Sequence, residues 1–241
     1  MKSKKGGRMA SEYIYTHILG LDEKMEGGIP KGYIILISGP PGSYKSSIAF
    51  YIAYKNMLFK EEGKVLYLTL SQNKESLISQ MEEMNLNLKN LPKGTKFEII
   101  NGDFLREGGI KNIDDFIALM EKYRERWENM DFLIVDNLNF LYLYTIMRSK
   151  DTLMDIVKLF ESMRKIGATT FLICETPLGS NKISQFEIES YLCDGIFHLN
   201  MERIGRTLGR YISVIKLRGR KHSTDYYPLV VDDMGFRILT H

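Results

Sequence analysis

The chain has 241 residues, of which 44% are hydrophobic and 26% charged. Those proportions are typical of a folded globular protein, and the net charge of +3 says little about partners. No apolar run approaches ~18 residues without charges, and the N-terminus lacks the apolar core of a signal peptide. We therefore expect a cytoplasmic protein with no membrane segment. Cys174 and Cys193 lie in or beside apolar runs without a C-x-x-C partner, which argues against a disulfide framework or a zinc site.

Residues 1–12 differ in composition from the rest of the chain. Lys2, Lys4, Lys5 and Arg8 surround a glycine pair there. We expect this segment to be a flexible, solvated basic tail, and a nucleic-acid contact is the alternative. Residues 13–241 contain no internal repeat, low-complexity linker or change in composition that marks a boundary. We expect them to form a single domain.

Beyond the tail, short apolar runs rich in β-branched residues alternate with longer runs whose apolar residues recur at helical spacing. Gly167 is placed to end the last of these helices. Strands that alternate with helices indicate βαβ units, so we expect an α/β fold with a mostly parallel sheet covered by helices on both faces. The pattern predicts strands over 32–38, 65–70, 96–101, 131–136 and 168–174, and helices over 45–60, 74–84, 113–127 and 150–167.

The pattern changes in the last third of the chain. Residues 175–185 are polar and indicate a loop. Several strand-like segments then follow without long helices between them: "GIFHLN", "GRYISVIKLRG" and "DYYPLVVDDMGFRIL". We expect these segments to extend the sheet as antiparallel strands or hairpins.

The stretch "GPPGSYKS", residues 39–46, nearly matches the phosphate-binding P-loop pattern G-x-x-x-x-G-K-[ST]. A predicted strand precedes it and a predicted helix follows, so backbone N–H groups at the helix N-terminus would face phosphate oxygens. We expect Lys45 to reach the β- and γ-phosphates of ATP and Ser46 to ligate Mg²⁺. The candidate nucleotide-binding residues are Gly39, Pro40, Pro41, Gly42, Ser43, Tyr44, Lys45, Ser46 and Ser47.

Tyr44 stands where the pattern has its second glycine. Glycine allows a positive φ or a backbone close to phosphate, whereas tyrosine tolerates a positive φ poorly. Either the local backbone suits a side chain, or the loop is distorted. The ring must point away from the phosphates, where it can pack on a neighbouring element or subunit. We expect retained but altered nucleotide affinity, and a merely tolerated substitution is the alternative.

Asp136 ends the apolar run "FLIVD", as a Walker B aspartate does. Such a carboxylate holds Mg²⁺ directly or through water. Taken alone, Asp136 is equally consistent with a turn residue at a strand end. Together with the P-loop it favours a nucleotide site with ATP or ADP and Mg²⁺ as cofactors.

The flanking segments resemble a known family. "ILGLDEKMEGGIPKGYIILISGPPG", residues 18–42, resembles the opening of KaiC domains, in which a GGIP-x-G segment leads into the P-loop. Residues 189–239 resemble the family's D-G-[IV] strand, its K-x-R-G-x-x-H segment and its closing strands. The chain is thus similar to KaiC-like ATPase domains and archaeal RadA paralogues of the RecA superfamily. The resemblance implies a RecA-like P-loop NTPase core that assembles into rings or filaments, with ATP between subunits.

The same resemblance assigns a role to the segment "KLRGRKH". In KaiC-like rings, the lysine and arginine of this segment reach the nucleotide of the neighbouring subunit. The matching residues are Lys216 and Arg218, with His222 at the family's histidine position. A cationic pair there would offset charge on the γ-phosphate. Without the resemblance, a solvated basic strand end is the simpler interpretation.

One departure from the family concerns hydrolysis. KaiC-like enzymes carry a Glu-Glu pair that activates the attacking water, and here Ser71 and Gln72 stand at those positions. Gln72 is a weak catalytic candidate because an amide can orient water, and Glu75 would substitute only if the loop bent back. Loss of a general base costs about 10²–10⁴-fold in rate. We therefore expect an ATP-binding regulator with weak or absent hydrolysis.

Two other functions are alternatives. A RadA-type recombination protein would bind single-stranded DNA through the loops expected over 141–150 and 176–185, where aromatic and basic residues suit base stacking and phosphate contact. The favoured interpretation of the tyrosines there is packing in the core or at a subunit interface. The second alternative is an active ATPase or autokinase like the clock protein KaiC, against which the missing glutamates and the single domain argue. The candidate nucleic-acid residues are Tyr142, Tyr144, Arg148 and Lys150.

Overall fold

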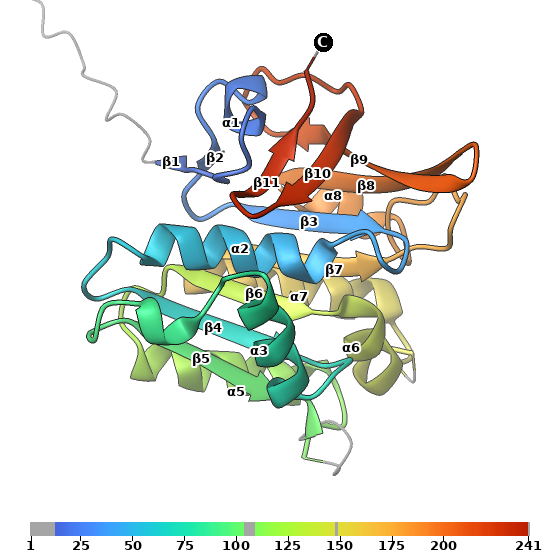
Figure 1. Cartoon of the computed structure of the whole chain (residues 1–241). Coiled ribbons are helices and arrows are strands. Elements are labelled where there is room, and N and C mark those ends of the chain that lie inside the picture. The colour runs from blue at the N-terminus through green and yellow to red at the C-terminus, as the bar shows by residue number, and fades with distance from the viewer. Residues whose placement is uncertain (1–12, 104–108, 148, 241) are drawn as a thin grey trace, which may run out of the picture.

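The computed structural model describes residues 13–103, 109–147 and 149–240. Within them a nine-stranded sheet runs through the molecule in the order β11-β10-β9-β8-β3-β7-β6-β4-β5 (Figure 1). A two-stranded sheet pairs β1 (Tyr13–Ile14) with β2 (Ile29–Pro30). The predicted basic tail over 1–12 lies outside the described residues.

The parallel half of the sheet consists of the predicted apolar runs. Every residue of β3 and of β6 is buried, as expected for strands covered on both faces. Their order in the sheet is β3-β7-β6-β4-β5, and helices connect these strands over one face or the other. These strands are β3 (Ile34–Gly39), β4 (Lys64–Thr69), β5 (Lys96–Asn101), β6 (Phe132–Asp136) and β7 (Thr169–Glu175).

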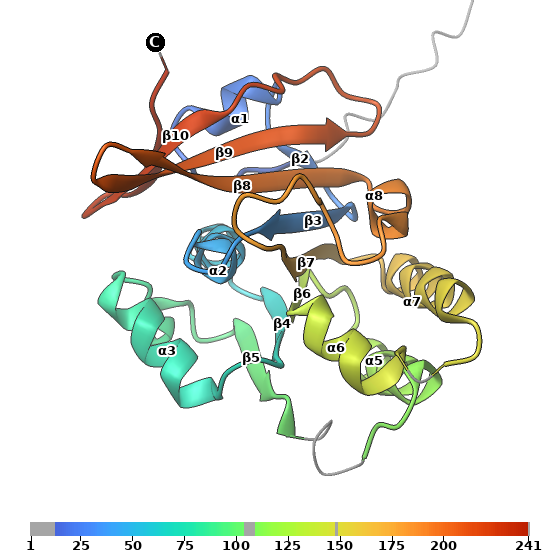
Figure 2. The same ribbon diagram turned by 90° about the vertical axis from the view of Figure 1, so that its right-hand side faces the viewer.

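Helices cover both faces of the sheet and enclose two apolar cores. Figures 1 and 2 show α2 and α3 on one face, and α5, α6 and α7 on the other. The expected end of the last long helix is confirmed, because Gly167 follows it with a φ of 75°. The helices are α2 (Lys45–Met57), α3 (Lys74–Glu83), α5 (Ile113–Arg126), α6 (Leu138–Thr145) and α7 (Thr152–Ile166), with shorter turns α1 (Leu21–Lys24), η1 (Leu88–Asn90) and α8 (Ile188–Leu192).

The C-terminal strands extend the sheet beyond β3. β8 (Gly195–Ile204) pairs with β3 in parallel, which differs from the expected antiparallel arrangement. The connection that includes α8 returns the chain to the starting edge of the sheet and so sets this direction. β9 (Thr207–Leu217), β10 (Tyr227–Asp232) and β11 (Gly235–Ile238) then follow as antiparallel strands, as predicted. Among the helices of the described residues, none combines the length and apolar character needed to cross a membrane.

Parallel pairing brings four strand ends to one edge of the sheet. Gly39 at the end of β3 stands opposite Glu175 at the end of β7, and Thr69 at the end of β4 stands opposite Asp136 at the end of β6. In parallel α/β sheets this carboxyl edge is where ligands bind. The candidate site lies there.

Candidate nucleotide-binding site

The loop between β3 and α2 has the glycines that its shape requires. A Cβ atom on Gly39 would lie 2.4 Å from the carbonyl oxygen of Leu199, so this glycine allows β8 to approach closely. Gly42 has a φ of 78° and open space around it, so it is needed for its backbone conformation alone. The two glycines therefore serve different purposes.

The carbonyl oxygen of Pro40 organises the loop from inside. It accepts hydrogen bonds from the Ser43 backbone N–H (3.3 Å), the Ser43 hydroxyl (2.7 Å) and the Lys45 ammonium (2.8 Å). Ser43 is fully buried and its side chain is turned into the loop. This hydrogen bond to Pro40 holds the Lys45 ammonium against the loop.

The first turn of α2 is open to an anion. The helical hydrogen bonds begin with the N–H of Ile48, which donates to the Tyr44 carbonyl, and the Tyr44 side chain provides no capping bond. The N–H groups of the residues between them are the ones that a helix cannot satisfy internally. Together with the positive end of the helix dipole, they favour phosphate or another anion.

A cavity of about 650 Å³ opens over this turn, within the size range of small-molecule sites. Of the predicted residues, Gly39, Pro40, Pro41 and Ser43 shape the loop without lining the cavity. Sequence reasoning missed its lining from α3 and from β7 and β9. The lining residues are Gly42, Tyr44, Lys45, Ser46, Ser47, Ser71, Gln72, Gln80, Glu83, Met84, Glu175 and Arg210.

Asp136 is buried next to Lys45 and Ser46 and does not itself line the cavity. Burial raises the pKa of its carboxyl group, and hydrogen bonds from the Tyr67 and Ser46 hydroxyls and the charge of Lys45 oppose that rise. Burial likewise lowers the pKa of Lys45, which the charges of Glu175 and Asp136 oppose. Each ion therefore stabilises the other in a site that is poorly solvated.

The residues around Asp136 fit Mg²⁺. A carboxylate beside the Ser46 hydroxyl is the hard oxygen set that Mg²⁺ prefers. Among the described residues there is no group of three histidine, cysteine or acidic side chains that would hold a metal without help. Mg²⁺ is commonly bound by one or two protein oxygens together with nucleotide phosphates, which is the role that Asp136 and Ser46 would have.

Tyr44 adopts the left-handed conformation of the glycine that it replaces, with φ 71° and ψ 21°. Its ring packs edge-on against Phe236 of β11, with ring centroids 5.8 Å apart, and Tyr44 also lines the cavity. The guanidinium of Arg210 lies over the ring at 4.5 Å from its centroid. The tyrosine therefore keeps a left-handed backbone, and residues of the neighbouring strands accommodate its ring.

Ser71 and Gln72 line the cavity, whereas Glu75 is exposed in the first turn of α3 and does not. The nearest carboxylate to Lys45 on the cavity wall is Glu175, with its Oε1 atom 4.0 Å from Nζ. Sequence reasoning missed Glu175. Glu175 ends the strand that pairs with the P-loop strand, and this position in the sequence could have identified it.

Comparison with known proteins identifies the family. The family model for the KaiC ATPase domain matches residues 14–241, which is nearly the whole sequence. The chain belongs to the KaiC ATPase family. This result, with the sheet order above, confirms the resemblance to KaiC domains and the RecA-like α/β fold, and the family's ATPase character implies nucleotide binding.

Relatives agree with this assignment. A UPF0273 protein of Saccharolobus solfataricus is 28% identical over 92% of this chain and 81% of its own length. The clock protein KaiC of Synechococcus elongatus is 25% identical over 92% of this chain, which spans only 43% of that protein. The crystal structure of a KaiC-like protein of Pyrococcus horikoshii superposes with a TM-score of 0.80, covering 96% of this chain and all of that one, at 24% identity.

The K-x-R-G segment of this KaiC-family chain lies far from the chain's own cavity. Lys216 pairs with Ile196 near the start of β8, whereas the P-loop follows the end of β3, to which β8 is parallel. The Lys216 ammonium donates to the carbonyl of Ser190 at 2.6 Å, and Arg218 pairs with Asp194 at 3.0 Å.

Neither of these two cations lines the cavity of its own subunit. Burial also lowers the pKa of Lys216. The third predicted residue of the segment, His222, faces the Arg220 carbonyl through Nδ1 at 3.0 Å.

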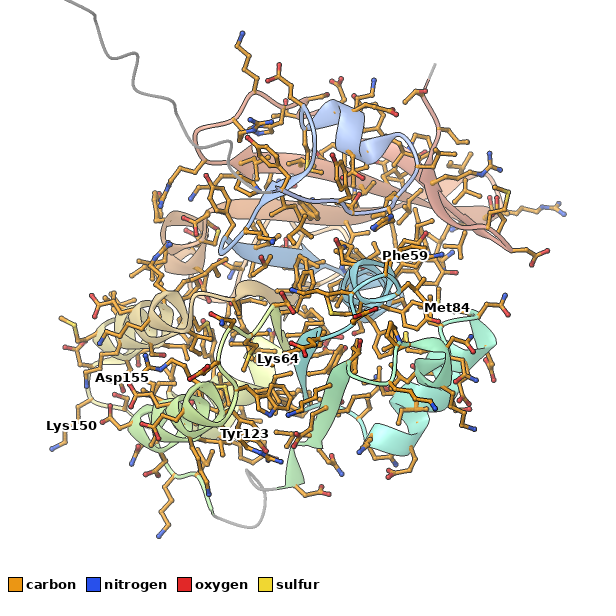
Figure 3. The ribbon with its side chains drawn as sticks, turned by 90° about the vertical axis from the view of Figure 1, so that its left-hand side faces the viewer. Phe59, Lys64, Met84, Tyr123, Lys150 and Asp155 are labelled. Carbon is orange, nitrogen blue, oxygen red and sulfur yellow. The ribbon has the colours of Figure 1, made fainter. Side chains whose placement is uncertain are left out.

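The two candidate nucleic-acid tyrosines, Tyr142 and Tyr144, lie on a helix and not in a loop. The loop expected over 141–150 is wrong in its first half, because α6 continues to Thr145. Tyr142 is fully buried and its ring centroid lies 5.4 Å from that of Phe186, while Tyr144 is partly buried. Arg148 lies outside the described residues. Lys150 is exposed, and Figure 3 shows it on the opposite flank of the molecule from Met84, which lines the cavity.

Proposed function

We propose that this KaiC-family protein binds ATP with Mg²⁺ in the P-loop cavity and hydrolyses it slowly or not at all, so that nucleotide occupancy has a regulatory role. The observation that carries the proposal is that two groups of residues line the same cavity. One group keeps the residues that bind phosphate, and the other lacks the residues that activate water for hydrolysis. Lys45 and Ser46 belong to the phosphate-binding group, and Ser71 and Gln72 stand at the positions of the hydrolytic pair.

Support for binding comes from complementary charges. The open first turn of α2 and the Lys45 ammonium provide positive potential at one end of the cavity. Asp136 and the Ser46 hydroxyl would hold Mg²⁺, which neutralises phosphate charge when it is bound. The cavity then extends to α3 at Gln80 and Met84, which leaves room for the nucleoside.

Support for slow hydrolysis comes from the side chains at positions 71 and 72. Neither a serine hydroxyl nor an amide takes a proton from water at neutral pH, and losing a general base costs about 10²–10⁴-fold in rate. Glu175 also lines the cavity, but its Oε1 atom lies 4.0 Å from the Lys45 ammonium, with which it forms an ion pair. Gln72 remains able to orient water.

Assembly into a ring or filament is part of the proposal. Lys216 and Arg218 are too far from their own cavity to serve it, but the segment that carries them would face a neighbouring subunit's site in a head-to-tail assembly. Bound ATP would then hold the interface together by offering its γ-phosphate to both cations.

Isothermal titration with ATP·Mg²⁺ tests binding, with Lys45→Ala as the variant expected to lose it. Light scattering after size-exclusion chromatography, with and without ATP·Mg²⁺, tests assembly. No heat at millimolar ATP·Mg²⁺ would overturn the binding proposal. A monomer in both conditions would overturn the assembly proposal and leave binding intact.

A further inference from the structure

Arg210 belongs to the cavity although it is far from the P-loop in sequence. It lies on β9 opposite Met201 of β8, and β8 is the strand that approaches Gly39. This pairing brings the Arg210 side chain across the end of the sheet to the cavity wall, where it stands with Lys45 and Ser46. Neither the P-loop pattern nor the K-x-R-G segment includes this residue.

Two contacts hold the Arg210 guanidinium in place. Its Nε atom donates to the carbonyl oxygen of Gly42 at 2.9 Å, and its Cζ atom lies over the Tyr44 ring, 4.5 Å from the ring centroid. Among the described residues no carboxylate lies within ion-pair distance of it, in contrast to Arg164 and Arg218, which share Asp194. Since a guanidinium has five N–H donors and Nε uses one, the terminal nitrogens are available to a ligand in the cavity.

The Tyr44 ring is itself anchored. Phe236 packs edge-on against both Tyr44 and Tyr51, with centroid distances of 5.8 and 5.0 Å. The ring is therefore wedged between the C-terminal strands and the arginine. A left-handed backbone costs a non-glycine residue about 1–2 kcal/mol, and the contacts of the ring are what a glycine at this position would lack.

We infer that Arg210 binds the phosphates of the nucleotide from within the same subunit, and that Tyr44 is the platform that positions it. The inference rests on the proposed nucleotide binding and adds a cation to it. A planar fork beside the first turn of α2 suits the oxygens of a polyphosphate, because arginine pairs with two phosphate oxygens at once. The tyrosine in place of the pattern's glycine then has a function instead of being a tolerated change.

Titration calorimetry of Arg210→Ala with ATP·Mg²⁺ and ADP·Mg²⁺ is the test. A charge-assisted contact predicts affinity lower by about ten-fold or more. A loss shared by both nucleotides, or confined to ATP, supports phosphate contact. Arg210→Lys should recover part of the loss, because it keeps the charge without the fork. Tyr44→Gly should weaken binding as well, but should add little in the double variant with Arg210→Ala.

Arg203→Ala is the matched control. Arg203 lies on the same hairpin and its Nε atom also donates to a glycine carbonyl, that of Gly205, but it does not line this cavity. Its removal should leave both affinities unchanged. If Arg210→Ala binds both nucleotides as tightly as the wild type does, the inference is wrong. A lower melting temperature of the nucleotide-free variant would then show that Arg210 only stabilises the fold. Absence of binding by the wild type would instead overturn the proposed function.

Discussion

The hydroxyl group of Tyr67 donates a hydrogen bond to the Asp136 carboxylate across 2.6 Å, and both side chains are buried. The two residues come from neighbouring strands, β4 and β6, at the carboxyl edge of the sheet. The bond stabilises the ionised form of a carboxylate whose pKa burial raises. Tyr67 therefore supports the candidate Mg²⁺ ligand without lining the cavity.

Replacing Tyr67 with phenylalanine should destabilise the nucleotide-free protein. The change leaves a buried carboxylate with one donor fewer, which costs about 1–3 kcal/mol of unfolding free energy. Urea denaturation at neutral pH measures this loss. Tyr54→Phe is the matched control, since its hydroxyl donates to the Asn87 carbonyl at 3.1 Å and no charge is involved. Equal losses for the two variants would show that the charge of Asp136 does not matter.

The left-handed backbone of Tyr44 gives an unusual order of stabilities. Alanine at this position keeps the backbone strain and loses the ring, whereas glycine loses the ring and relieves the strain. We expect Tyr44→Gly to be more stable than Tyr44→Ala by about 1 kcal/mol. Denaturation of both nucleotide-free variants checks this, and an alanine variant at least as stable as the glycine variant would mean that the loop rearranges.

His198 makes stability depend on pH. Burial lowers the pKa of this histidine below its usual 6.5, and its Nδ1 atom lies 2.7 Å from the Tyr226 hydroxyl. The unfolded chain therefore binds the proton more tightly than the folded one. The stability contributed by neutral His198 is present above pH 6.5 and is lost as the pH falls from there towards the folded pKa.

Unfolding free energy measured from neutral pH downward should thus fall more steeply for the wild type than for His198→Asn. The comparison is needed because burial lowers the pKa of His17 as well. Parallel curves for the two proteins would show that His198 does not titrate across this range.

Local pattern was enough to predict the elements that surround the site. The predicted strand over 96–101 has the same bounds as β5, because turn residues mark both ends of this run in the sequence. The helix α6 was missed although Asn137 caps it by accepting from the Phe140 N–H, a signal visible in "DNLNF". Residues 141–150 were assigned to a loop by analogy with DNA-binding RecA-like proteins, and for the first half of that range the cap was the better guide.

The missing part of the site depends on distant contacts. Arg210 and Gly42 are 168 residues apart, and they meet only because β8 joins β3 in parallel, which the sequence pattern did not predict. The conformation of Tyr44 was left open for the same reason. Its partners Phe236 and Arg210 come from strands whose order in the sheet cannot be inferred from periodicity.

Restoring the acidic pair should separate binding from hydrolysis. Ser71→Glu with Gln72→Glu places carboxylates on the cavity wall where the family has them. We expect the double variant to raise ATP turnover by about 10²-fold or more, with affinity changed far less. Phosphate release at saturating ATP·Mg²⁺ measures this, with Lys45→Ala added to show that any gain arises in this cavity. If Tyr44→Gly alone restored fast turnover, the division between binding and hydrolysis would be wrong.

Slow hydrolysis at an intact binding site is tested most directly by the fate of bound nucleotide. The protein is incubated with labelled ATP and Mg²⁺, recovered on a filter, and the retained nucleotide is identified. We expect intact ATP on the wild type and none on Lys45→Ala. Retained ADP with phosphate released faster than about one per minute, and abolished by Lys45→Ala, would show that another group in the cavity activates water.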